Sequence, residues 1–378
     1  MTQIDFAELA TLIRCNSHSK NKVGIDEHGE QMIVLLAPLG FAMTRYQRDN
    51  IGDHLLFHTP KRAGKKVLLL GHLDTVFPPN TFTEFKQDED WVYGPGVCDM
   101  KGGNFVALNA LRNLKAEFAP LYNIDFLLVS DEETGSDDSK YLTAKLAKDY
   151  DACLVFEAAG KDHEVVIGRK GIATFDIEII GKAAHAGNHY ADGIDANYAL
   201  ANMLTEMTAL TDLKKGSTVN VGKISGGLST NTISPKASMM VEARFKTLKE
   251  QQRLLKGIEN ICFAMEITGV QINVNGGLQR GVMSPDVLQQ QLLDEIAMIL
   301  DEPLKTEQRG GVSDANVVSA AGVPTLDGFG PYGDGDHTIH ERALKSSFEL
   351  RIKQVTQILS TWCYQAETQE SKQSALEI

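Results

Sequence analysis

The sequence predicts an α/β protein whose main domain is built on a mixed, largely parallel sheet and carries a smaller inserted domain of ferredoxin-like topology. In the first half of the chain, short apolar runs alternate with segments of helical spacing, the order typical of a parallel sheet. From about Gly171 the apolar residues alternate as they do in half-exposed strands. A length of 378 residues is too great for one ordinary core and suits two domains.

The best-defined strand of the main domain spans residues 67–73, a run of branched apolar residues. A strand that is covered on both faces need not alternate, so an uninterrupted run fits a buried strand. The other strands that we expect in the first half are 42–46, 54–58, 123–130 and 153–156. The helices that we expect there are 5–14, about 27–38, a segment that follows Asp99, and 141–148.

The predicted elements of the inserted domain follow the order β-α-β-β-α-β. They are strands at 172–180, 217–224, 237–245 and 270–274, and helices at 196–210 and 248–265. This order is the split βαβ arrangement of ferredoxin-like folds. We therefore assign residues 171–277 to the insertion, and residues 1–170 and 278–378 to a discontinuous main domain. After the insertion, the chain returns to the main domain through a helix at 285–300, a strand at 323–328 and a helix at 343–362.

Composition excludes several classes of protein. With 37 basic and 50 acidic residues, the formal net charge is −13, which argues against a nucleic-acid partner and against an anionic membrane surface. The five cysteines are scattered and form no C-x-x-C pair, which favours a reducing compartment and argues against a thiolate zinc site. No apolar stretch reaches the ~18 residues of a membrane span, and the first residues do not resemble a signal peptide. We expect a cytoplasmic protein.

Four polar residues fall at strand ends or in the loops beyond them. They are His72, Asp99, Glu133 and Glu157. Ligands of open α/β sheets bind outside the carboxyl ends of the strands, so these side chains should enter one crevice. His337 lies in a glycine-rich loop and is a fifth candidate. Imidazoles and carboxylates without sulfur suit one or two zinc ions with open positions, and so many carboxylates would repel one another without a cation.

Two further acidic residues have a predicted role beside such a centre. Asp74 stands two residues after His72, where its carboxylate can hold the second imidazole N–H. In Asp131-Glu132-Glu133, neighbouring residues point in different directions, so one glutamate can bind metal while the other acts as general base. By itself, this acidic run is equally compatible with a solvated turn.

Three segments together resemble the co-catalytic di-zinc metallopeptidases, a family that includes glutamate carboxypeptidase, acetylornithine deacetylase, succinyl-diaminopimelate desuccinylase and aminoacylase. The segments are Gly71–Val76, Gly94–Gly103 and Asp131–Ser136. The likeness is closest to glutamate carboxypeptidase and covers nearly the whole chain. It implies a zinc-peptidase-like catalytic domain, a lid and dimerisation domain in the insertion, and two Zn²⁺ per subunit with Co²⁺ as a substitute.

The resemblance also implies the role of each candidate. His72 and Glu157 would bind one zinc ion, Glu133 and His337 the other, and Asp99 would bridge them. Asp74 would orient His72, and Glu132 would be the general base. A cis peptide is implied between Asp99 and Met100. The motif His-x-x-x-Glu favours His337 over His340 as the last ligand, because Glu341 follows it by four residues.

In the insertion, the resemblance assigns three residues. His185 lies in a matching histidine motif and would reach the active site of a partner subunit to stabilise an oxyanion, which implies a homodimer. Asn231 would contact the carbonyl of the substrate, and Arg244 its carboxylate, for which the bidentate guanidinium is suited. The alternative for Arg244 is a surface ion pair.

The sequence therefore predicts a zinc-dependent hydrolase that cleaves an amide bond next to a free carboxylate in a small peptide or N-acyl amino acid. A carboxypeptidase is the leading interpretation, and an N-acyl amino acid deacylase is the alternative within enzymes. The non-enzymatic alternative is a relative that binds metal and ligand without turnover. The intact Glu132 and the full ligand set argue against it.

Overall fold

The structure is a computed structural model that describes residues 4–266 and 268–374, and the side chains of these residues up to 364. The chain forms two compact units. The first comprises the residues up to Gly168, Pro285–Arg309 and the residues from Ser313 onward, and the second comprises Arg169–Ser284 with Gly310–Val312. The insertion expected at residues 171–277 lies within the second unit, which continues to Ser284 because its last strand is longer than expected.

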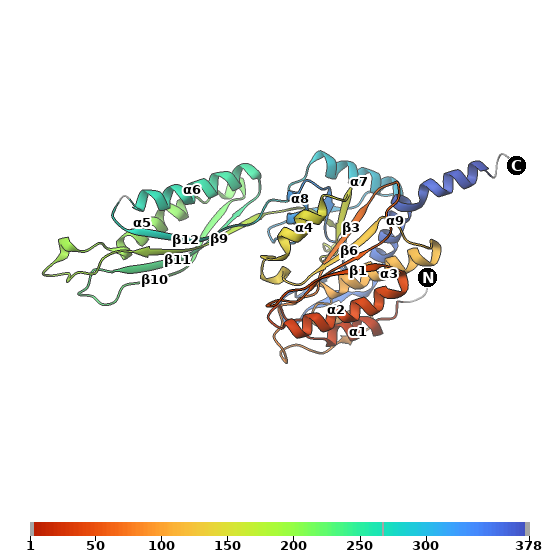
Figure 1. Cartoon of the computed structure of the whole chain (residues 1–378), viewed down its shortest axis with the longest axis horizontal. Helices are drawn as coiled ribbons and strands as arrows, with labels where there is room; N and C mark the ends of the chain where they lie inside the picture. Colours follow the sequence, from red (N-terminus) through yellow and green to blue (C-terminus); the bar gives the residue numbers. More distant parts are fainter. Residues whose placement is uncertain (1–3, 267, 375–378) are drawn as a thin grey trace. The chain divides into compact units, whose positions relative to one another are not determined.

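A mixed sheet of six strands forms the centre of the first unit, as predicted (Figure 1). Its order is β1-β2-β6-β3-β7-β14, and β6, β3, β7 and β14 are parallel neighbours, whereas β1 and β2 pair antiparallel. The strands are β1 (Ala42–Tyr46), β2 (His54–His58), β6 (Ile124–Val129), β3 (Val67–His72), β7 (Ala152–Val155) and β14 (Thr325–Leu326). The carboxyl ends of β6, β3 and β7 therefore meet at one edge of the sheet.

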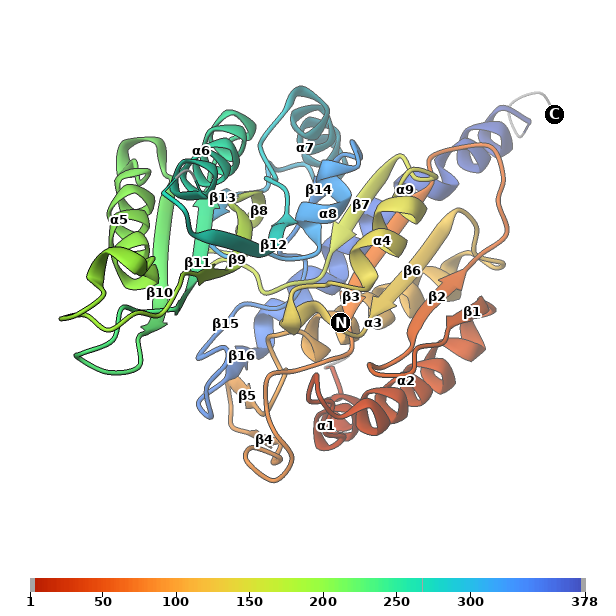
Figure 2. The same cartoon turned by 60° about the vertical axis from the view of Figure 1, so that its left-hand side comes forward.

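Helices cover both faces of this sheet (Figure 2). The helices of the unit are α1 (Ala7–Arg14), α2 (Lys22–Leu36), α3 (Lys101–Glu117), α4 (Ser139–Ala147), α7 (Val287–Leu300), α8 (Ala315–Ala320) and α9 (Lys345–Ser374). Val67 and Leu69 of β3 enter the large core that includes α1, α2, α3 and α9. Leu68 and Leu70 are buried on the opposite face, so β3 is covered on both sides, as its unbroken apolar run indicates.

Five helices begin two or more residues away from their predicted starts: α1, α2, α4, α7 and α9. Helix α2 starts at Lys22 rather than near residue 27, because the side chain of Asn21 accepts a hydrogen bond from the N–H of Gly24 and caps the first turn. Helix α9 starts at Lys345 rather than at 343, because residues Arg342–Leu344 form strand β16. Helix α8, strand β8 (Val165–Arg169), strand β13 (Thr306–Arg309) and the strands of a small second sheet were not predicted.

This small sheet has the order β15-β16-β5-β4, and Figure 2 shows its strands side by side. The strands are β15 (Gly333–Asp334), β16 (Arg342–Leu344), β5 (Trp91–Tyr93) and β4 (Lys86–Gln87). Pairing of β16 with β5 fixes the segment before residue 99 against the segment after residue 334, although they are far apart in the sequence. Two of the predicted metal-ligand loops are therefore held together by one local sheet.

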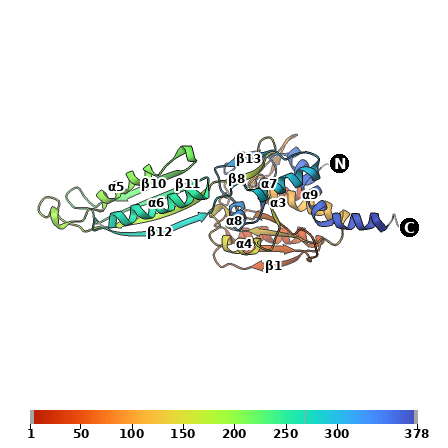
Figure 3. The same cartoon turned by 90° about the horizontal axis from the view of Figure 1, so that it is seen from above.

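The second unit has the predicted split βαβ topology (Figure 3). Its elements are β9 (Gly171–Ile180), α5 (Ala196–Ala209), β10 (Thr218–Gly226), β11 (Lys236–Phe245), α6 (Leu248–Glu266) and β12 (Gln271–Arg280). The sheet order is β10-β11-β9-β12 with all neighbours antiparallel. Both helices pack on one face, over a core that includes Ile177, Met203 and Val241, and the ferredoxin-like prediction is confirmed.

Within the described residues, no helix is both long enough and apolar enough to cross a membrane.

Candidate metal centre

The predicted ligands of the main domain come together at the carboxyl edge of the six-stranded sheet. His72 is the last residue of β3, Glu133 lies in a short 3₁₀ turn (Glu132–Thr134) after β6, and Glu157 follows β7 by two residues. Asp99 lies two residues before α3, and the peptide bond between Asp99 and Met100 is cis. His72, Glu133 and Glu157 therefore lie at or beyond the carboxyl ends of parallel strands, where ligands of such sheets bind.

The five side chains form two groups that share Asp99. In one group, His72 Nε2 lies 3.0 Å from Asp99 Oδ1 and 3.8 Å from Glu157 Oε1. In the other, His337 Nε2 lies 3.2 Å from Asp99 Oδ2 and 3.1 Å from Glu133 Oε2. Within each group the potential ligand atoms all lie within 4.8 Å of one another. Asp99 thus offers one carboxylate oxygen to each group, as a bridging ligand must.

His337, rather than His340, enters this cluster. His337 lies in the turn between β15 and β16 with a left-handed backbone (φ 62°), and this turn aims its ring at Asp99 and Glu133. The backbone N–H of His340 donates to the hydroxyl of Thr338, and in the part of the chain that the structure describes its ring belongs to neither group. The spacing of the His-x-x-x-Glu motif therefore indicated the histidine that the structure brings in.

Asp74 supports the centre through both its main chain and its side chain. The Nδ1–H of His72 donates to the backbone carbonyl of Asp74 at 2.9 Å, whereas the Asp74 carboxylate is 3.4 Å away. That carboxylate also accepts the backbone N–H groups of Glu132 and Glu133, each at 3.2 Å, and the hydroxyl of Ser19 at 2.8 Å. Asp74 therefore fixes the tautomer of His72 through its main chain and fixes the Glu132–Glu133 turn through its side chain.

Electrostatics show why a cation suits this cluster. Burial, together with the charge of Asp99, raises the pKa of Glu133 to about 8. Burial and the charge of Asp99 also raise the pKa of Glu157. Burial also opposes ionisation of Asp99, but hydrogen bonds from His337 and His72 outweigh it and hold its pKa well below the usual range. Three carboxylates in one buried place compete for positive charge, which protons or metal ions must supply.

The donor set fits one or two divalent cations. Glu133 Oε1 is buried and has no hydrogen-bond partner among the described atoms, although buried carboxylate oxygens are normally satisfied. The ligand atoms are imidazole nitrogens and carboxylate oxygens, which suit zinc with open coordination positions. The nearest thiol, Cys98, is buried and hydrogen-bonds to Asp336 instead of joining either group.

Glu132 lies beside the two groups without belonging to them. It is 8% exposed, and its charge contributes to the raised pKa of both Glu133 and Glu157, so its carboxylate is close to both. A carboxylate in this place can accept a proton from a water molecule that the cluster holds.

Three buried polar residues near the centre were missed by sequence reasoning or given no role. They are Ser19, Lys101 and Glu341. The ammonium group of Lys101 donates to the carbonyls of Leu12 and Cys15 at the end of α1, and burial lowers its pKa to about 8. No spacing signal links Ser19 to Asp74 across 55 positions. Glu341 could have been noticed only through the His-x-x-x-Glu motif.

The second unit brings His185 and Asn231 together. The carbonyl of Asn231 accepts the N–H of Ala186, and a β-bridge joins His185 to Thr232. The Nδ1 atom of His185 accepts the backbone N–H groups of Gly187 and Asn188 at 3.2 and 3.1 Å. Because both partners are donors, Nδ1 must carry the lone pair, so a neutral His185 ring keeps its proton on Nε2.

Arg244 is engaged by a neighbour on its own strand. Its Nε and Nη2 atoms donate to the two carboxylate oxygens of Glu242 at 2.7 and 3.2 Å, and Nη1 donates to the carbonyl of Gly310 at 3.1 Å. The ion pair that was the alternative interpretation of Arg244 is therefore present. Glu242 holds the guanidinium by both of its oxygens, so a substrate carboxylate that binds Arg244 must displace this ion pair.

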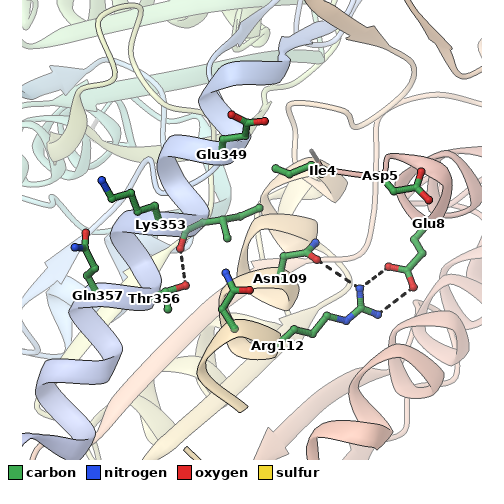
Figure 4. A pocket seen from close by; sticks show the side chains of 11 residues that line it. Ile4, Asp5, Glu8, Asn109, Arg112, Glu349, Lys353, Thr356 and Gln357 are labelled. Carbon is green, nitrogen blue, oxygen red and sulfur yellow. Dashed lines mark hydrogen bonds and ion pairs between the residues drawn. The ribbon is translucent and has the colours of Figure 1, made fainter. Parts of the chain in front are cut away.

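A cavity of about 720 Å³ lies in the first unit between α1, α3 and α9 (Figure 4). The guanidinium of Arg112 on its wall is already paired with both carboxylate oxygens of Glu8. The cavity shares no residue with the two ligand groups. It therefore offers no support for a catalytic role.

Comparison with known proteins agrees with this geometry. Residues 68–361 match the profile of Peptidase family M20/M25/M40. The chain is 28% identical over 340 residues to carboxypeptidase G2 of Pseudomonas sp. (strain RS-16), covering 87% of this chain and 82% of that protein. It is 26% identical over 360 residues to a succinyl-diaminopimelate desuccinylase of Dinoroseobacter shibae, covering 88% and 92%.

Solved structures share the fold. A tripeptidase from Staphylococcus aureus superposes with a TM-score of 0.77 at 23% identity, covering 95% of this chain and 97% of that chain. A dinuclear metal-binding peptidase of the M20 family from Bacillus subtilis superposes with a TM-score of 0.68 at 15% identity, covering 95% and 99%.

Proposed function

The chain belongs to Peptidase family M20/M25/M40, a family of metal-dependent hydrolases that act on C–N bonds, and from this premise we propose that it is a zinc-dependent carboxypeptidase. Its substrate is a small peptide or N-acyl amino acid, cut at the amide bond next to a free carboxylate. One observation supports the proposal above all: Asp99 offers one oxygen to each of two ligand groups, beside the separate carboxylate of Glu132.

In this proposal His72, Glu157 and Asp99 hold one zinc ion, and Asp99, Glu133 and His337 hold the other. When bound, the ions polarise the carbonyl of the substrate and lower the pKa of water. Glu132 takes the proton from the attacking water on a carboxylate oxygen and delivers it to the nitrogen of the leaving amine. Asp74 keeps Glu132 in place through the N–H of that residue.

The second unit supplies the groups that bind and polarise the substrate. It acts as a lid and as the dimerisation domain, so that His185 serves the active site of the partner subunit. The Nε2–H of His185 donates to the developing oxyanion. The backbone N–H groups of Gly187 and Asn188, which donate to Nδ1, support this role because they leave the ring proton on Nε2. Asn231 lies in the adjoining loop and contacts the carbonyl.

Arg244 binds the free carboxylate of the substrate. We therefore expect dipeptides and N-acyl amino acids that end in Glu, Asp, Arg or Ala to be cleaved at least tenfold better as free acids than as C-terminal amides. Arg244→Ala should raise the KM of the free acids roughly tenfold or more, since charge-assisted hydrogen bonds contribute ~1.5–3 kcal/mol, and should leave the amides unchanged. Steady-state kinetics on this panel measure both effects.

The same panel separates the alternatives. Faster cleavage of N-acyl amino acids than of dipeptides would identify a deacylase, as expected for a relative of acetylornithine deacetylase. Equal cleavage rates for the free acids and the C-terminal amides would contradict the proposal that the enzyme recognises the free carboxylate of its substrate. No turnover of any substrate by metal-loaded protein would favour a non-enzymatic binding protein.

The proposal also predicts the metal content. Saturated protein should hold two zinc ions per chain by elemental analysis, because five ligands form two groups around one shared carboxylate. Chelation should lower the midpoint of thermal unfolding, because the buried carboxylates then repel one another, and Zn²⁺ or Co²⁺ should restore it. A limit of one ion per chain at saturation would contradict the two-metal arrangement.

A further inference from the structure

The carboxylate of Glu341 occupies a buried place that metal binding alone does not explain. Glu341 is 1% exposed and lies directly before β16. Its Oε1 atom accepts the backbone N–H groups of Cys98 and Asp99 at 2.9 and 3.0 Å. Its Oε2 atom accepts the N–H of Gly96 at 3.0 Å. Burying a carboxylate costs free energy, and the three convergent amides offset part of that cost.

These three amides belong to the loop that delivers Asp99. The loop leaves β5 at Tyr93, and the N–H of Gly94 donates to the main-chain carbonyl of Glu341 at 3.3 Å. The backbone between residues 94 and 99 therefore wraps around one side chain. The N–H of Asp99 itself is part of this contact, so movement of the loop away from Glu341 moves the shared carboxylate.

Glu341 is equally tied to the loop that delivers His337. The two residues are four positions apart in the turn between β15 and β16, and the N–H of Glu341 donates to the carbonyl of Thr338 at 3.2 Å. One side chain thus connects the loop of Asp99 with the loop of His337. These loops are more than 200 residues apart in the sequence, and each contributes to the group that also contains Glu133.

We infer that Glu341 is a positioning residue that sets the bridging geometry of Asp99 and couples it to His337. The inference rests on the proposed function in taking Asp99 and His337 as metal ligands. Glu341 is not itself a ligand, because both of its oxygens face backbone N–H groups and it belongs to neither ligand group. Partners that orient metal ligands typically change metal affinity 10- to 100-fold when they are removed.

Glu341→Gln tests this role, because it keeps the shape and removes one acceptor. A glutamine has a single side-chain oxygen, so its NH₂ group must face either the N–H of Gly96 or the N–H groups of Cys98 and Asp99. Two hydrogen-bond donors then face each other and one hydrogen bond or more is lost. We expect the zinc affinity of Glu341→Gln, measured by competition with a chromophoric chelator, to fall ~10- to 100-fold. The visible spectrum of the Co²⁺ form should change as well, because the ligand geometry is altered.

Asp125→Asn is the matched control. Asp125 is a buried carboxylate of β6, 4% exposed, that accepts the N–H of Thr59 and the hydroxyl of Tyr150, far along the strand from the ligands. Its loss should lower the thermal midpoint and leave zinc affinity and the Co²⁺ spectrum unchanged. Glu341→Asp keeps both oxygens and the charge, and should regain part of the affinity that Glu341→Gln loses.

Three results would overturn the inference: wild-type zinc affinity in Glu341→Gln, an equal loss in Asp125→Asn, or failure of both Glu341 variants to fold. Failure of both variants to fold would mean that Glu341 stabilises the fold of the first unit as a whole rather than positioning the ligands. Failure of the proposed function would look different, because wild-type protein would then bind zinc without releasing amine from any substrate. The ranking of zinc affinities does not depend on turnover.

Discussion

Glu132→Gln is expected to lower kcat by ~10²–10⁴-fold while zinc content stays at the wild-type level, because a general base typically contributes a factor of this size. Glutamine keeps the shape of the side chain and removes its basicity. The main chain of residue 132 still donates to Asp74, so the turn should keep its position. Steady-state kinetics with elemental analysis on the same preparation measure both quantities.

Glu133→Gln is the natural companion variant. Glu133 belongs to a ligand group and Glu132 does not, so Glu133→Gln should lose metal and Glu132→Gln should not. Near-normal kcat in Glu132→Gln would rule it out as the base. Loss of zinc from Glu132→Gln, with zinc retained in Glu133→Gln, would mean that the roles of the two residues are exchanged.

His185→Ala is expected to lower kcat by ~10²-fold, the usual effect of removing one oxyanion donor. All five proposed ligands lie in the first unit and His185 lies in the second, so zinc content should not change. Kinetics together with metal analysis test this expectation. A variant that loses zinc along with activity would show that His185 has a structural effect on the centre.

Mixing inactive subunits tests whether His185 acts across a dimer. If His185→Ala and Glu132→Gln proteins exchange subunits, a mixed dimer has one site with an intact Glu132 and an intact His185 from the partner. Statistical mixing makes half of the dimers mixed, each with one competent site, so activity should return to about a quarter of wild type. Absence of recovery after proven exchange would mean that His185 serves its own subunit or none.

Most of the fold could be predicted because the buried residues of helices and strands recur at regular spacings in the sequence. Strands β1 and β2 were predicted with the bounds they have, and β3 ends within a residue of its predicted end. The grouping of His72, Glu133 and Glu157 followed from one topological rule, since each lies at or beyond the end of a parallel strand, whereas Asp99 and His337 lie in loops held by the small sheet. Short elements left no such trace: strands of two or three residues, such as β15 and β16, are too short for a period to be visible.

What the sequence could not supply were contacts between distant polar groups. The start of α2 was missed because Gly24 and Gly29 weaken its helical pattern, whereas the cap at Asn21 compensates for that weakness. The carboxylate of Asp74 was expected beside His72 and lies 3.4 Å from its Nδ1 atom, but its hydrogen bonds with the N–H groups of Glu132 and Glu133 were not predicted. Hydrogen bonds of this kind depend on where loops meet in space, which no local spacing encodes.

The order of the ligands along the chain has a consequence for biosynthesis. About 180 residues, including the whole second unit, separate Glu157 from His337. At ~5–20 residues per second, a ribosome needs roughly ten to forty seconds to make that stretch. During this interval the nascent chain already carries His72, Asp99, Glu133 and Glu157 but neither His337 nor Glu341. It can assemble at most one complete ligand group, so under the proposed function the metal position of His72, Asp99 and Glu157 can form during synthesis, and the other only after the loop of His337 has emerged.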